Sequence, residues 1–209
     1  KSALWAREYH EIKALGARNS TTRTPDQTEA ARFWEAVAPQ VYQPVVHSVA
    51  MQPGRDLARN ARLLSAVYQA VDDALIAVWD AKYHYALWRP ITAIRNGDID
   101  GNEATERDGA WLPLIETPMH PEYPCAHCIV SASIGAVLQA EVGDGAMPRL
   151  SSTSPLLPGV THRWASVAEF TREVADARVH AGGHYRNSTQ VGSAMGRQIG
   201  ELSAAHNLR

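Results

Sequence analysis

Two histidines and three cationic side chains stand at spacings that could gather them around one small anion. Lys82 precedes Arg89 by seven residues, which is two turns of a helix, so we expect both on one helix face. Arg178 precedes His184 by six residues, which would separate them on an unbroken helix. Gly182-Gly183 lies between them and permits the backbone turn that would bring His184 back toward Arg178.

A helix start is the next part of this expected site. Pro124 is predicted at the first helical position, ahead of an apolar run over 129–142, because a proline there loses no hydrogen bond. The backbone N–H groups of Cys125, Ala126 and His127 would then be free to bind an anion. His127 also adds an imidazole that titrates near neutral pH.

These residue types predict a particular chemistry. Arginine binds tetrahedral oxyanions through paired donors, and lysine adds a point charge. One histidine would attack or coordinate the central atom, while the other transfers a proton to the leaving oxygen. No carboxylate cluster suited to a cation accompanies them in the sequence, so we expect an oxyanion site that works without a metal cation.

In order and spacing, these residues resemble the superfamily of type 2 phosphatidic acid phosphatases and vanadium-dependent haloperoxidases. The three matching signatures are Lys82 to Arg89-Pro90, Pro124 to His127, and Arg178 to His184. The strings that are similar to the soluble haloperoxidase branch lie at 79–85, 88–95 and 121–124. The resemblance extends over nearly the whole chain.

The resemblance implies a helical-bundle core that binds vanadate or phosphate. His184 would coordinate vanadium or bond phosphorus, and His127 would act as acid and base. Lys82, Arg89 and Arg178 would neutralise the equatorial oxygens. In the haloperoxidases, bound vanadate takes up hydrogen peroxide and oxidises a halide; in the phosphatases, the same pocket forms a phosphohistidine. The implied function is halide oxidation by hydrogen peroxide, with an acid phosphatase as the alternative.

The chain departs from the family pattern at several positions. The second signature reads Pro-Cys-Ala-His where Pro-Ser-Gly-His is usual, and the thiol of Cys125 is a weaker donor than a hydroxyl. Ala126 keeps its N–H but not the conformational freedom of glycine. Ala177 replaces a serine, and Ser188 stands where the phosphatases have an aspartate that orients the second histidine. These changes favour a further alternative: a non-catalytic member that keeps the fold and an anion pocket.

Two more groups of residues lie beside the signatures. Cys125 and Cys128 have a spacing that fits a local redox pair, half a metal site or two packed thiols. Zinc needs about four ligands, and no second Cys/His cluster follows, so zinc is not favoured. The residues expected to support the site from its surroundings are Trp88, His120 and Ser188.

The elements that must position these residues are helices. Helical patterns or helix signals are predicted over 3–15, 25–38, 41–49, 55–89 (one helix or two), 124–142, 166–181 and 188–205. Thr24 is the expected N-cap of the second. Loops are expected at 96–102, 111–124 and 143–159, and alternating strand patterns are nearly absent. The predicted class is therefore all-α, a helical bundle in one domain over 1–209, and the resemblance implies the C-terminal part of a longer chain.

Composition limits the partners. The 209 residues carry a formal net charge of -2 and are 45% hydrophobic, which is typical of a soluble globular protein without a general attraction for nucleic acid. No stretch reaches the roughly 18 apolar residues of a membrane span. We expect small-molecule partners (halide and peroxide, or a phosphoester) and a homodimer through exposed helical faces. The compartment is not readable; a secreted or extracytoplasmic location is one option.

Overall fold

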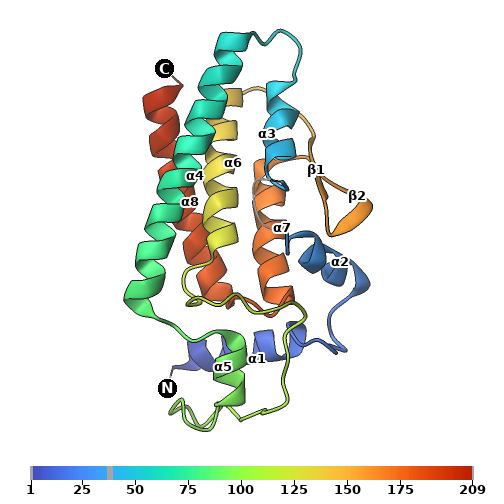
Figure 1. The fold of residues 1–209 in the computed structure, drawn as a ribbon, viewed down its shortest axis with the longest axis vertical. Coiled ribbons are helices and arrows are strands. Elements are labelled where there is room, and N and C mark those ends of the chain that lie inside the picture. Colours follow the sequence, from blue (N-terminus) through green and yellow to red (C-terminus); the bar gives the residue numbers. More distant parts are fainter. Residues whose placement is uncertain (1, 37–39, 209) are drawn as a thin grey trace.

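The computed structural model describes residues 2–36 and 40–208 of the chain. Helices make up most of this part, and one short β-hairpin lies at the side of the bundle (Figure 1). The elements in chain order are α1 (Ala3–Leu15), α2 (Pro25–Phe33), α3 (Gln43–Ala50), α4 (Leu57–Tyr85), α5 (Pro90–Arg95), α6 (Ala126–Val142), β1 (Leu150–Ser154), β2 (Leu157–Trp164), α7 (Val167–His180) and α8 (Arg186–Asn207).

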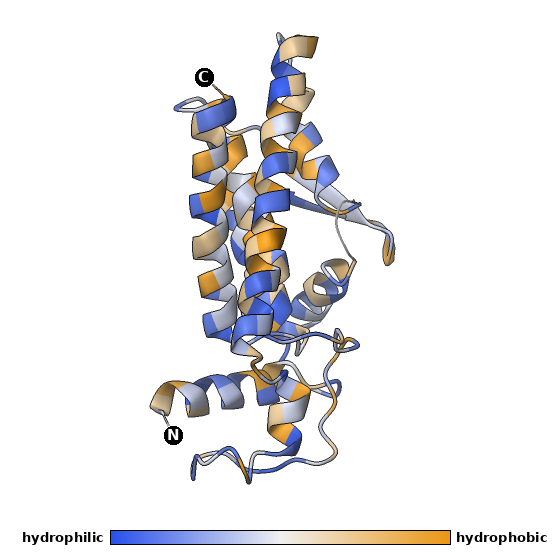
Figure 2. Cartoon of the chain, turned by 60° about the vertical axis from the view of Figure 1, so that its left-hand side comes forward, coloured by the Kyte–Doolittle hydropathy of each residue, from blue (hydrophilic) through white to orange (hydrophobic). Residues whose placement is uncertain are grey.

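Helices α4, α6, α7 and α8 run side by side along the long axis of the molecule (Figure 1). Helix α6 packs against each of the other three. Most of its residues are small or apolar and lie on all sides of the helix, so it is buried over most of its length; polar residues such as Gln139 lie near its end. Helix α4 instead buries one stripe, which includes Leu63, Ala70 and Val78, and turns polar residues outward (Figure 2).

Glycines allow α8 to approach α6 closely. Gly192, Gly196 and Gly200 recur at intervals of four residues along α8. A Cβ atom at Gly196 would lie 2.1 Å from the carbonyl oxygen of Ile129, and one at Gly192 would lie 2.6 Å from that of Cys125. This contact places the start of α6 directly against the first turns of α8.

Helices α1 and α5 lie at one end of the bundle, below its four long helices (Figure 1). They enclose a second, smaller core, whose buried members include Tyr9, Ile12, Ile94, Trp111 and Tyr185. Tyr185 follows His184 directly in the chain. The small core therefore anchors the turn that carries this histidine.

Several expected helices are confirmed. The predicted helix over 3–15 forms as α1, and Thr24 caps α2 through a complete capping box with Gln27. The helices expected over 166–181 and 188–205 form as α7 and α8. The expected helix over 25–38 ends at Phe33 in the structure, and its last two residues lie outside the described part of the chain.

The one or two helices expected over 55–89 form as one helix, and the expected end at Arg89 is wrong. Helix α4 stops at Tyr85, and Ala86 takes a left-handed conformation with φ of 48°. Arg89 is therefore not on the same helix face as Lys82; it is the N-cap residue of α5. No glycine or proline marks the point where α4 ends, so the sequence pattern gave no stop signal there.

The start of α6 also differs from the expectation. The helix begins at Ala126, and Cys125, in an extended conformation, is its N-cap, so Pro124 precedes the helix. The backbone N–H of Cys125 donates to the carbonyl of Ser188 at 3.2 Å. That bond holds Cys125 outside the helix and links the starts of α6 and α8.

The loop expected over 143–159 contains part of a hairpin. Strands β1 and β2 pair antiparallel, with Leu150 opposite Trp164. The buried face of β1 consists of Leu150, Ser152 and Ser154, and the Ser152 hydroxyl donates to the Val41 carbonyl at 2.5 Å. Because serines fill most of this face, the strand has no alternation of apolar and polar residues to detect.

Within residues 2–36 and 40–208, none of the helices combines the length and the apolar character that crossing a bilayer requires.

Replacing Gly196 by Ala should destabilise the protein. The new methyl group would meet the backbone of Ile129, which cannot move without shifting α6. We expect a loss of about 1–3 kcal/mol in the free energy of unfolding, although alanine is intrinsically the better helix former. Gly109→Ala is the control, because nothing lies closer than 3.9 Å to its Cβ position. Chemical denaturation would show the effect, and equal stability of the two variants would contradict it.

Candidate functional site

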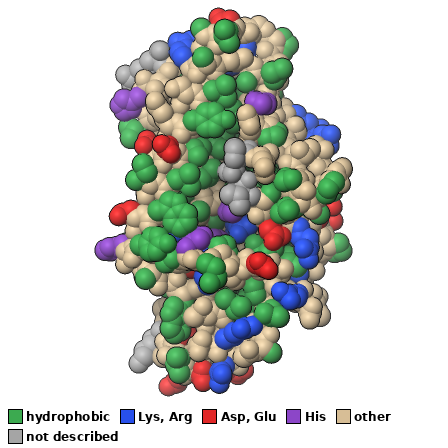
Figure 3. Space-filling view, in the orientation of Figure 1, with side chains coloured by type: hydrophobic (Ala, Val, Ile, Leu, Met, Phe, Trp, Pro, Cys, Tyr) green, Lys and Arg blue, Asp and Glu red, His purple; other side chains and the backbone are tan. Residues whose placement is uncertain are grey.

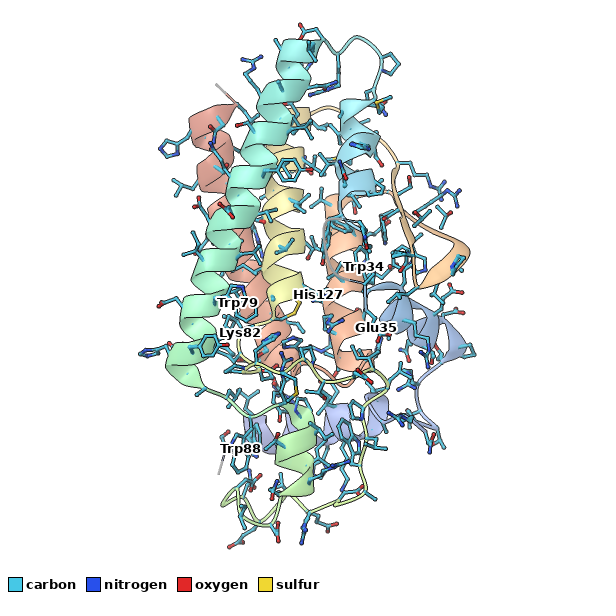
Figure 4. The ribbon with its side chains drawn as sticks, in the orientation of Figure 1. Trp34, Glu35, Trp79, Lys82, Trp88 and His127 are labelled. Atoms are coloured by element: carbon cyan, nitrogen blue, oxygen red, sulfur yellow. A yellow bond between two sulfur atoms is a disulfide. The ribbon has the colours of Figure 1, made fainter. Side chains whose placement is uncertain are left out.

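Three segments of the chain meet near the lower end of the bundle. They are the end of α4 with the following turn to Arg89, the start of α6 with the irregular segment before it, and the turn between α7 and α8. Lys82 on α4 and His127 on α6 lie on neighbouring helices at this level (Figure 4). The buried ionisable side chains gathered here, which we call the cation cluster, are Lys82, Arg89, Arg178, His184 and Glu122.

Lys82 is completely buried, and its ammonium group is bound by backbone carbonyls. Its Nζ atom donates to the carbonyl oxygens of Pro121 at 2.9 Å and Glu122 at 2.8 Å. Burial, together with the positive charges of Arg89 and Arg178, lowers the pKa of Lys82 to about 7, and the negative charge of Glu122 opposes this shift. Lys82 thus stands near the point where it loses its charge.

Arg89 reaches the same site from the turn after α4. Its guanidinium donates to the carbonyls of His120 at 2.8 Å and Gly183 at 2.9 Å. One nitrogen also lies 3.2 Å from Nε2 of His184. Arg89 and Lys82 therefore converge as expected, but through the bend at Ala86 and not through a shared helix face.

The turn between α7 and α8 carries His184 back toward Arg178. Gly182 has φ of 77°, a left-handed conformation that glycine adopts without strain. The N–H groups of Gly183 and His184 both donate to the carbonyl of Arg178 at 3.2 Å. The role expected for the glycine pair is confirmed, because the chain reverses there and both side chains join the cluster.

Glu122 is the main residue of the cluster that the sequence analysis missed. It is completely buried, and its carboxylate accepts from Nδ1 of His184 at 2.8 Å and from the Tyr185 N–H at 3.0 Å. The other oxygen accepts from the Ser188 hydroxyl at 2.6 Å. Burial raises the pKa of Glu122 to about 7, and these hydrogen bonds and the nearby cations oppose that shift. The sequence carried one signal for this residue. Glu122 lies between two prolines, where no helix is expected, so it cannot be explained as one of the charged residues on the solvent-facing side of a helix.

Two polar atoms beside the cluster have no hydrogen-bond partner among the described residues. They are Nε of Arg178 and Nε2 of His127, and both are inaccessible to solvent. Arg178 donates from another nitrogen to the Trp34 carbonyl at 2.9 Å. Burial, together with the charge of Arg178, lowers the pKa of His127 well below its usual value, so this imidazole is neutral at pH 7. Buried polar atoms without partners are costly, and an added ligand would satisfy them.

The charges of the cluster do not balance. Among the buried side chains described there, three cations face one carboxylate, and the partly exposed Glu35 is the further acid that acts on Arg178. Buried charges are normally paired, so the excess of positive charge calls for an anion. The N–H groups of Ala126 and His127, at the start of α6, donate to no other described group. The residues present thus fit a small oxyanion such as vanadate or phosphate.

Cys125 cannot act as the thiol donor expected of it. It forms a disulfide with Cys128, and both residues are completely buried. Its sulfur accepts from the N–H of Cys128 at 3.3 Å, and its own N–H is used by Ser188. The open choice among redox pair, half metal site and packed thiols therefore resolves to a bonded pair in this structure. Of the donors expected here, Ala126 and His127 remain.

The three supporting residues differ in position. His120 lies against the cluster, because Nδ1 accepts from Arg89 at 3.0 Å, and Ser188 reaches it through Glu122. Burial and the Arg89 charge lower the pKa of His120 to about 4. Trp88 is 43% exposed, and no hydrogen bond or ring contact joins it to the cluster within the described residues. Its expected supporting role stays a prediction.

The cluster comes near the surface at His120. The ring of Trp79 meets that of His120 edge-on, with centroids 4.7 Å apart, and Tyr83 stacks beside Trp79. Hydrophobic side chains gather on this face of the molecule, with histidine and basic groups at the lower part of the band (Figure 3). A groove of about 1010 Å³ runs between α6, α7 and α8, and the residues that line it do not include the cluster.

We expect sulfate to bind more weakly as the pH rises. Sulfate keeps its charge from about pH 6 to about pH 8, whereas Lys82, with a pKa of about 7, loses its proton, and Glu122 gains negative charge in the same range. Both changes make the net charge of the cluster less positive, so the Kd for sulfate should rise about tenfold over this interval. Isothermal titration of the desalted protein measures it. The slope should be shallower for Lys82→Met, and an affinity independent of pH in the unchanged protein would contradict the assignment.

Comparison with known proteins places this arrangement in a family. A family model described as the VCPO second helical-bundle domain matches residues 62–209. A vanadium chloroperoxidase from Curvularia inaequalis is 30% identical over 149 residues, which are 59% of this chain and 23% of that protein.

Solved structures show the same fold. A bacterial vanadium-dependent iodoperoxidase has a TM-score of 0.79 and 27% identity, over 100% of this chain and 49% of its own. The holo-type bacterial vanadium-dependent chloroperoxidase has a TM-score of 0.74 over 98% of this chain and 48% of its own; at 20% identity it shows the fold alone. The chain spans about half the length of these solved relatives. Because the family model covers well over half of its residues, this all-α chain belongs to the vanadium haloperoxidase family, and its residues 62–209 match the second helical-bundle domain of that family.

Proposed function

We propose that this chain binds vanadate in the cation cluster and that the protein acts as a haloperoxidase, oxidising a halide with hydrogen peroxide. The observation that carries the proposal is the buried excess of positive charge around Nε2 of His184. The chain spans about half the length of its solved relatives, so a haloperoxidase activity like theirs is a proposal.

The side chains divide the work of holding the oxyanion. Lys82, Arg89 and Arg178 would neutralise its oxygens, and the N–H groups at the start of α6 would donate to it. His184 would bind the central atom through Nε2, because Nδ1 is engaged by Glu122. Vanadate, when bound, supplies the centre that activates hydrogen peroxide toward a halide.

His127 is the proposed acid and base. Its Nε2 is buried, has no partner in the described structure, and lies on the first turn of α6. Its lowered pKa keeps the ring neutral at pH 7, so Nε2 can accept a proton from a bound reactant and return it later. The expectation from sequence is retained here as a proposal.

Two alternatives remain, each with its own observation. A phosphomonoester hydrolase would use the same Nε2 of His184 as nucleophile, and the arrangement of Glu122 and His184 suits that role equally well. A non-catalytic anion-binding protein is favoured by the disulfide, which removes the side-chain donor at position 125. A homodimer stays a prediction.

One experiment separates the three functions. The protein is incubated with vanadate, hydrogen peroxide and chloride, bromide or iodide in turn, and halogenation of a phenolic dye is measured; a parallel sample receives p-nitrophenyl phosphate without vanadate. Vanadate-dependent halogenation supports the proposal. Phosphate release alone favours the hydrolase, and silence in both assays with measurable vanadate binding favours the non-catalytic protein.

Replacing His184 by Ala should abolish vanadate binding and any turnover, since it removes the nitrogen that would bind the central atom. His206→Ala is the matched control, because His206 is an exposed histidine near the end of α8. Equilibrium dialysis with vanadate and the halogenation assay report the two effects. Turnover that survives in His184→Ala would show that the role is assigned to the wrong residue.

Replacing Cys125 by Ser should strengthen oxyanion binding. A serine hydroxyl at the N-cap would still accept from the Cys128 N–H and would also donate a proton, which the disulfide sulfur cannot do. A hydrogen bond to a charged group corresponds to about tenfold in Kd. Cys128→Ser also breaks the disulfide but adds no hydroxyl at position 125, so it is the control. Equal vanadate affinity in the two variants would argue against a donor role for this position.

A further inference from the structure

We infer that Glu122 is the positioning residue of His184: its carboxylate fixes the imidazole with the proton on Nδ1 and the lone pair on Nε2. The inference rests on the proposed function and deepens it, since it names what prepares His184 to bind an oxyanion. It concerns a residue from a different part of the chain, 62 positions away from the histidine.

The hydrogen bonds of the Glu122 carboxylate all go to one short segment. Oε1 accepts from Nδ1 of His184 and from the Tyr185 N–H, and Oε2 accepts from the Ser188 hydroxyl. Among the described residues, no lysine or arginine side chain forms an ion pair with this carboxylate. The carboxylate of Glu122 therefore binds the segment that carries His184 and does not neutralise the cations by direct contact.

The backbone of Glu122 is held as firmly as its side chain. Its N–H donates to the Leu87 carbonyl at 3.0 Å, and its own carbonyl accepts from Lys82 at 2.8 Å. Glu122 therefore links two sides of the site. Residues at the end of α4 and just after it bind its main chain, and residues at and before the start of α8 bind its carboxylate. A shift of either segment would change the orientation of the imidazole.

The geometry decides which nitrogen of His184 carries the proton. Oε1 of Glu122 accepts from the Tyr185 N–H, so it is an acceptor oxygen, and Nδ1 of His184 at 2.8 Å donates to it as well. In the neutral ring, Nε2 then holds a lone pair, and the Arg89 guanidinium at 3.2 Å donates to it. An available lone pair is what a bond to a central vanadium or phosphorus atom requires, and carboxylates commonly hold metal-binding histidines in this way.

The test combines a spectroscopic readout with binding. In protein labelled with 15N-histidine, the nitrogen shifts of His184 should show a proton on Nδ1 in the unchanged chain, and a proton on Nε2 there would overturn the inference without any variant. Glu122→Gln retains an oxygen that can accept from Nδ1, so the same tautomer is expected. Glu122→Met removes the acceptor at similar volume, so the Nε2-protonated form should become populated.

Binding separates positioning from a merely structural role. In Glu122→Met, vanadate affinity should fall about tenfold or more relative to sulfate affinity, as loss of such a partner does at metal sites. Sulfate is held only by charge and hydrogen bonds and does not need the lone pair. Glu122→Gln should recover most of the vanadate preference. An unchanged tautomer and unchanged vanadate preference in Glu122→Met would overturn the inference.

The outcomes also distinguish this inference from the proposed function. If the unchanged protein binds no vanadate, the proposed function fails, while the tautomer of His184 in Glu122→Met still decides whether Glu122 positions the ring. If vanadate binds and halide is oxidised but the tautomer does not depend on Glu122, only the present inference fails.

Discussion

The removal of three cationic side chains from water is the constraint on which the rest of this site depends. Each buried charge costs several kcal/mol unless other groups replace its hydration. Here backbone carbonyls replace much of it: two bind Lys82, two bind Arg89, and one binds Arg178. The single buried carboxylate of the cluster, Glu122, serves His184 instead. Carbonyl dipoles solvate the cations without neutralising them, so the site keeps its attraction for an anion.

The backbone around the cluster is irregular because only non-helical segments have free carbonyl groups that can bind the cations. A helix uses its own carbonyl groups, except in the last turn. The proline-rich segment 111–124 forms no helix, so the carbonyls of His120, Pro121 and Glu122 are free to bind Lys82 and Arg89. Gly183, in the turn before α8, supplies another. The helices set the positions of the charged groups, and the loops between them provide the acceptors.

The sequence predicts which residues form this site better than it predicts the backbone path that brings them together. Residue types and spacing identified Lys82, Arg178 and His184, because the glycine pair 182–183 is a readable signal for a turn. The end of α4 was not readable, because Ala86 adopts its left-handed conformation without glycine. The β-hairpin was missed because its buried face is largely serine. Glu122 was missed because its partners lie more than 60 residues away, and no local period reports such a contact.

The uncompensated charge also bears on the choice among functions. A protein with only a structural role would be more stable with one cation of the cluster replaced by an apolar side chain, since buried ion groups seldom add stability. A ligand that binds only the folded state offsets this cost in proportion to the logarithm of its concentration over its Kd. The proposed binding of an anion would therefore offset the cost of the buried positive charge. The close α6–α8 contact at Gly192 and Gly196 fixes the start of α6 against α8, because the two backbones are already too close for a Cβ atom to fit between them.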